Sequence, residues 1–73
     1  MTSLPGGDGR SADHAELSAL TTAIEDLTRR VTRMTERYST GSRDDVVAAL
    51  EDAERALIQA SRRLTVAGRA LAG

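Results

Sequence analysis

The sequence predicts an all-α fold: an antiparallel hairpin of two helices that pairs with a second copy to form a dimeric four-helix bundle. Apolar residues recur in alternating steps of three and four along two segments of equal length, and a short stretch containing Gly and Ser separates them. The chain has only 73 residues and no cysteine. A single core of that size supplies little stability without a partner, which favours association.

Residues 1–11 contain the only proline and three of the six glycines, and this composition predicts a disordered tail. A helical hairpin is expected over 12–73, with its first helix at about 12–39. Asp13 and Glu16 have the spacing of a capping box at the start of this helix. Seven apolar residues then form one helical stripe, whose period excludes a strand. They are Leu17, Leu20, Ile24, Leu27, Val31, Met34 and Tyr38.

A turn is predicted at 39–42, where Gly41 suits the left-handed conformation after a helix and Ser42, with Asp45, suits the next helix start. The second helix is expected at about 43–71. Its stripe alternates large residues with alanine every seven residues, which predicts close packing against neighbouring helices. This stripe consists of Val46, Leu50, Ala53, Leu57, Ala60, Leu64, Ala67 and Leu71.

The charges are distributed as two antiparallel helices require. Acidic residues concentrate in the first half of each predicted helix and arginines in the second half, which complements each helix dipole. Antiparallel packing also brings the arginine-rich end of one helix beside the acidic start of the other. Parallel packing would place like charges side by side.

The second helix carries more apolar surface than one neighbour requires, which favours a homodimer of hairpins. A twofold dimer uses one self-complementary surface twice. A threonine every seven residues, at Thr21, Thr28 and Thr35, flanks the first stripe and is expected to form a half-buried border. The residues predicted to carry the interface are Val46, Leu50, Ala53, Leu57, Ala60, Leu64, Ala67, Leu71, Leu20, Ile24, Leu27, Val31 and Met34.

The layout resembles that of Rop-like helical hairpins in its general plan of two helices, a short turn and Leu/Ala layers. This resemblance covers architecture, which does not carry function with it. An alternative function is a Rop-like regulator that binds RNA or DNA through an arginine ridge. Interleaved acidic residues, a net charge of −1 and a single aromatic residue make nucleic acid the less favoured partner. The ridge would consist of Arg55, Arg62, Arg63 and Arg69.

Residues that carry chemistry are sparse. His14 is the only histidine, and cysteine is absent, so the metal-binding spacings built on these residues are missing. Adjacent carboxylates such as Glu25 and Asp26 diverge around a helix instead of converging on one atom. No glycine-rich phosphate-binding motif occurs. We therefore expect no catalytic, cofactor or metal site, and the chain is predicted not to be an enzyme.

The sequence favours a non-enzymatic interaction module, a self-associating scaffold, adaptor or small regulator. An alternative is a partner-dependent subunit whose apolar helix face completes a bundle with another helical protein. No segment approaches the ~18 apolar residues of a membrane span, and residues 1–10 lack the apolar region of a secretory signal. The expected location is the cytoplasm. Basic residues that are all arginine, together with abundant alanine, are typical of a GC-rich bacterial genome.

Overall fold

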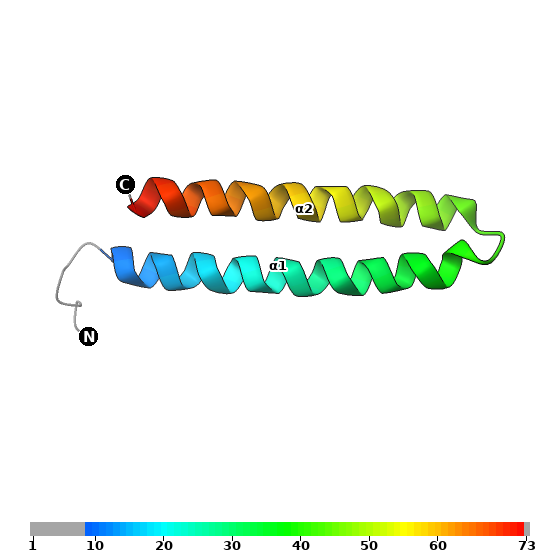
Figure 1. The fold of residues 1–73 in the computed structure, drawn as a ribbon, viewed down its shortest axis with the longest axis horizontal. Helices are drawn as coiled ribbons and strands as arrows, with labels where there is room; N and C mark the ends of the chain where they lie inside the picture. The colour runs from blue at the N-terminus through cyan, green and yellow to red at the C-terminus, as the bar shows by residue number, and fades with distance from the viewer. Residues whose placement is uncertain (1–8, 73) are drawn as a thin grey trace.

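The computed structural model describes residues 9–72, which form two long helices joined by one turn. Helix α1 spans Arg10–Ser39 and helix α2 spans Asp44–Ala72. The helices lie side by side and run in opposite directions, so the start of α1 and the end of α2 meet at the end opposite the turn (Figure 1). The predicted antiparallel helical hairpin is confirmed, and residues 9–72 contain no strand.

Local composition favours both helices. They are rich in alanine, leucine, arginine and glutamate, the residues with the highest helix propensities, and neither contains proline. Isolated helices are nevertheless marginal in water, because most helical stability in proteins comes from packing one face against a neighbour. Each helix of this hairpin therefore depends on the other.

The hairpin is a long, thin slab measuring 57 × 24 × 13 Å. Its radius of gyration is 17.2 Å, whereas a compact domain of this length would have a value of about 11 Å. The smallest dimension is close to the diameter of one helix with its side chains. As a result, no residue in the described part of the chain is buried.

The start of α1 differs from the prediction. The helix begins at Arg10, two residues earlier than expected, and Gly9 caps it with its backbone alone: the Gly9 carbonyl accepts the N–H of Asp13 at 2.9 Å. Gly9 has φ 72°, a left-handed conformation that glycine adopts without steric cost. No side chain caps this end, so the capping box predicted for Asp13 and Glu16 is wrong. The rest of the predicted tail, residues 1–8, lies outside the described residues, as does residue 73.

The end of α1 also closes differently. Within residues 9–72, Gly9 is the only glycine with positive φ, so Gly41 does not take the left-handed conformation expected of it. Thr40 keeps a right-handed conformation, and the Gly41 N–H donates to the Tyr38 carbonyl at 3.1 Å. The last turn of α1 is thus tightened by a bond between residues three apart, and the chain leaves the helix without a left-handed residue. Any residue can adopt such backbone angles.

Helix α2 begins at Asp44, and the residue before it, Arg43, supplies the cap. The Arg43 carbonyl accepts the N–H groups of Val46 and Val47, both at 3.1 Å, so Ser42 does not have the capping role that the sequence predicts for it. The Arg43 side chain folds over the first turn and binds both carboxylate oxygens of Asp45, with Nε to Oδ1 and Nη2 to Oδ2 each 3.1 Å. This guanidinium, followed by the N–H of Val46, lowers the pKa of the Asp45 carboxyl.

The contact between Arg43 and Asp45 predicts a pH effect on the start of α2. Because the pKa of Asp45 is lowered in the folded chain, its contribution is present above the unfolded value of about 4 and is lost as the pH falls through the folded value. NMR titration of the Asp45 carboxyl should show the lowered pKa, and Arg43→Gln should raise it. An Asp45 pKa that does not respond to Arg43→Gln would contradict this assignment.

Gly68 offers a test of the packing. It lies within α2, and a Cβ built on it meets no atom within 4 Å. Gly68→Ala should therefore stabilise the chain by about 1 kcal/mol through helix propensity, raising the midpoint of thermal unfolding by roughly 4–8 °C in circular dichroism. Gly9→Ala is the contrasting variant, because its left-handed φ makes a Cβ unfavourable. A lower midpoint for Gly68→Ala would show that the space is occupied.

Candidate interaction surface

The surface between the two helices, the seam, is identified by the half-buried residues that recur in regular steps along each helix; Thr32, Val46 and Ala60 are half-buried beside it. In α1 the seam residues follow steps of four and three. They are Leu17, Thr21, Ile24, Thr28, Val31 and Thr35. In α2 the steps are three and four, and the residues are Val47, Leu50, Glu54, Leu57, Ser61, Leu64, Gly68 and Leu71. Each helix therefore turns one continuous stripe toward the other.

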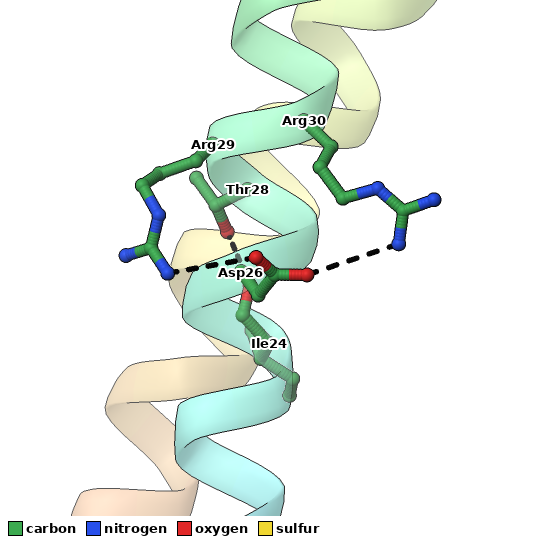
Figure 2. Close-up of polar contacts among 5 residues, drawn as sticks. All are labelled: Ile24, Asp26, Thr28, Arg29 and Arg30. Carbon is green, nitrogen blue, oxygen red and sulfur yellow. Dashed lines mark hydrogen bonds and ion pairs between the residues drawn. The ribbon is translucent and has the colours of Figure 1, made fainter.

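The α1 side of the seam alternates an aliphatic residue with threonine. The hydroxyl groups of Thr21, Thr28 and Thr35 donate to the carbonyl oxygens four residues earlier, at 2.9, 2.8 and 2.9 Å. Figure 2 shows this bond between Thr28 and Ile24. A hydroxyl group that is satisfied by its own helix needs no partner across the seam. Threonine can therefore face α2, where the sequence pattern alone favours a leucine.

A second row of apolar residues on α1 stays outside the seam. Leu20, Leu27 and Met34 are 42%, 43% and 37% exposed, although the sequence stripe groups them with the seam residues. Tyr38, the last member of that stripe, is 40% exposed. The predicted stripe is therefore wide enough for two neighbours, and α2 covers only one side of it.

A row of small residues on α2 lies in the corresponding position. Ala53 and Ala67 are exposed and Ala60 is half-buried. Each follows a seam leucine by three residues, as Leu20, Leu27 and Met34 follow seam residues in α1, and three residues correspond to the same rotation about either helix. Antiparallel helices are related by a twofold axis perpendicular to the hairpin plane, so both rows lie on the same side. We call this surface the outer apolar face; it comprises Leu20, Leu27, Met34, Ala53, Ala60 and Ala67.

The opposite side of the hairpin is polar. The residues that directly follow the seam positions there are Ser18, Glu25, Thr32, Glu51, Ile58 and Thr65, and Ile58, 40% exposed, is the single large apolar residue among them. On this side Thr32 Oγ1 donates to Glu54 Oε2 across the helices at 2.5 Å. An open pocket of about 410 Å³ is lined by Glu25, Thr28, Arg29, Ile58, Ser61 and Arg62. The exposed large apolar residues that border the seam of the described hairpin are thus concentrated on the side of the outer apolar face.

The thirteen residues predicted for the interface are divided between these surfaces. Leu50, Leu57, Leu64, Leu71, Ile24 and Val31 are half-buried in the seam, and Val46 is half-buried near the turn. The other six make up the outer apolar face. The sequence predicts Thr21, Thr28 and Thr35 at a half-buried border, whereas these residues lie in the seam itself. Their sevenfold spacing indicates that they share one helix face.

The predicted arginine ridge lies on the exposed surface of α2. Arg55, Arg62 and Arg69 recur every seven residues, with Arg63 beside them, and all four are exposed. Arg55 forms an ion pair with Asp52. No residue in the range 9–72 forms an ion pair with the other three arginines.

Acidic residues also interrupt the arginines of α1. Asp26 lies between Arg29 and Arg30, with its two oxygens 3.6 Å and 3.8 Å from the guanidinium groups on either side (Figure 2). All three side chains are more than half exposed, so these pairs contribute little to stability. They do reduce the positive potential at the middle of α1.

Two further properties concern the described residues. Among residues 9–72, no three histidine, aspartate or glutamate side chains are grouped so that they could hold a metal ion. Neither helix has the length and apolar character needed to cross a membrane.

The chain was also compared with models of known protein families, with curated proteins and with solved structures, and none matches. The likeness to Rop-like hairpins therefore rests on the general plan alone.

The seam threonines predict a measurable substitution effect. Thr28→Val keeps the β-branched shape, removes a hydroxyl that bonds only its own helix, and adds an apolar group facing α2. We expect stabilisation of up to about 0.8 kcal/mol, measured by urea unfolding. Thr22→Val is the matched control, because Thr22 is exposed and its replacement should change stability by less than about 0.5 kcal/mol. Equal effects at both positions would contradict the placement of Thr28 in the seam.

Proposed function

We propose that this chain is a non-enzymatic helical interaction module that associates with a second copy through the outer apolar face, giving a four-helix bundle that acts as a scaffold, adaptor or small regulator. The supporting observation is the row of Leu20, Leu27 and Met34, each about 40% exposed, on the side of the hairpin that also carries the alanine row. Contiguous apolar surface of this kind marks interaction sites in soluble proteins.

Pairing would give these side chains the second neighbour that the hairpin lacks. Apolar surface removed from water contributes about 25 cal/mol per Å². A twofold dimer would cover the outer apolar face of both copies with one interface. The polar composition of the opposite side favours continued contact with solvent there.

A second copy is the favoured occupant because the outer apolar face combines large residues on α1 with small residues on α2. Such a surface is complementary to itself, whereas the helices of a different protein would have to supply the same complementarity separately. Nucleic-acid binding through the arginine ridge has weaker support, because Arg55 already pairs with Asp52 and Asp26 lies between Arg29 and Arg30.

Two substitutions of matched exposure test the proposal. Leu27 on the outer apolar face is 43% exposed, and Ile58 on the polar side is 40% exposed. Sedimentation equilibrium over a concentration series should give twice the chain mass for the unmodified chain. Leu27→Asp should remove the association, because it places a charge within the apolar contact. Ile58→Asp should leave the dimer intact.

The outcomes separate the alternatives. A chain that is monomeric and weakly helical on its own would overturn self-association and point to a partner-dependent subunit. A dimer that survives Leu27→Asp but is lost with Ile58→Asp would place the interface on the opposite side. Circular dichroism on the same samples reports whether the loss of mass is accompanied by loss of helicity.

A further inference from the structure

The levels of the two helices within the hairpin are fixed by one contact. Thr32 Oγ1 donates to Glu54 Oε2, so the ends of these two side chains lie at the same height along the hairpin. Moving the same number of residues along both helices from this contact identifies other residues whose side chains reach about the same height. Leu20 is then level with Ala67, Leu27 with Ala60, and Met34 with Ala53.

At three successive heights, therefore, the outer apolar face presents a large side chain on α1 and an alanine on α2. Two hairpins can bring these faces together around a twofold axis in two ways. An axis along the length of the hairpin places α1 over α2 of the partner, with both turns at the same end. An axis across the length places α1 over α1 and α2 over α2, with the turns at opposite ends.

We infer, on the basis of the proposed function, that the axis runs along the length and that the two turns lie at the same end of the bundle. Rotation about a lengthwise axis leaves every residue at the same height along the hairpin, and places α1 over α2 of the partner. Each large residue of α1 therefore meets a small residue of α2: Leu27, for example, packs on Ala60 of the partner subunit. Alternation of large and small residues across facing positions fills an interface evenly. The crosswise axis would instead place leucine rows together on one side and alanine rows together on the other.

A flanking row on the same face follows the same rule. These residues are all exposed and directly precede Ile24, Val31, Tyr38, Leu50, Leu57 and Leu64. At equal heights each arginine of this row is matched by an alanine on the other helix. The matched pairs are Arg30 with Ala56, Arg37 with Ala49, and Ala23 with Arg63. The lengthwise arrangement therefore lets every arginine stem lie over a small residue, with no two arginines opposed.

The arrangement can be measured with spin labels, because the chain has no native cysteine. Ser42→Cys labels the turn and Ala12→Cys labels the opposite end, and both sites are exposed. Neighbouring helix axes are 8–10 Å apart, so lengthwise pairing should give label separations on the order of 20–30 Å at both sites. Crosswise pairing should give separations approaching the 57 Å length of the hairpin at both sites.

The same samples distinguish the two ways in which this inference can fail. Long separations in a species of twice the chain mass would overturn the lengthwise arrangement while leaving self-association intact. A species of single chain mass would overturn both the arrangement and the proposed function. Short separations at both sites in a dimer would support the inference.

A size exchange supplies a second test without labels. Leu27→Ala alone leaves a void and Ala60→Leu alone overfills the interface, so each should weaken association. In the lengthwise arrangement the double variant Leu27→Ala, Ala60→Leu restores one large and one small residue at each contact, and association should recover. In the crosswise arrangement the double variant leaves a void within the leucine rows and overfills the alanine rows, and should associate no better than the weaker single variant.

Discussion

Everything in this molecule depends on one stripe of contact between two helices. A helix with a single neighbour can shield only the side chains that face that neighbour, and only in part, so no side chain of residues 9–72 is enclosed. The packing energy of the hairpin is correspondingly small. The same geometry leaves one flank of each helix apolar and uncovered, so the fold itself creates the surface on which the proposed association rests.

Because the seam is only partly shielded from water, it accepts polar as well as apolar residue types. Threonine takes alternate positions along α1 because its hydroxyl returns to the carbonyl four residues earlier, so only its shape matters to α2. On α1, threonine takes alternate seam positions, and Leu20, Leu27 and Met34 lie on the outer apolar face. On α2 the order is reversed, because leucines lie in the seam and alanines lie on the outer apolar face.

The sequence was sufficient to predict the helices, their antiparallel order and the position of the turn, because a three-four period and a sharp change in composition are local signals. It was insufficient to predict the rotation of α1 about its axis. Leu20, Leu27 and Met34 fit the period as well as the seam threonines do, and hydrophobicity alone ranks them higher. The caps at Gly9 and Arg43 were also missed, since both act through backbone carbonyls, which every residue possesses.

The thinness of the slab has a consequence for how the chain tolerates change. In a thick domain a truncated side chain leaves a cavity that the surroundings cannot fill. In a slab 13 Å thick, water reaches the space from either side. A single truncation in the seam therefore replaces a side-chain contact with water and lowers the stability only slightly. The free energy of unfolding of such a molecule is therefore distributed over many residues along its length, and no single residue dominates it.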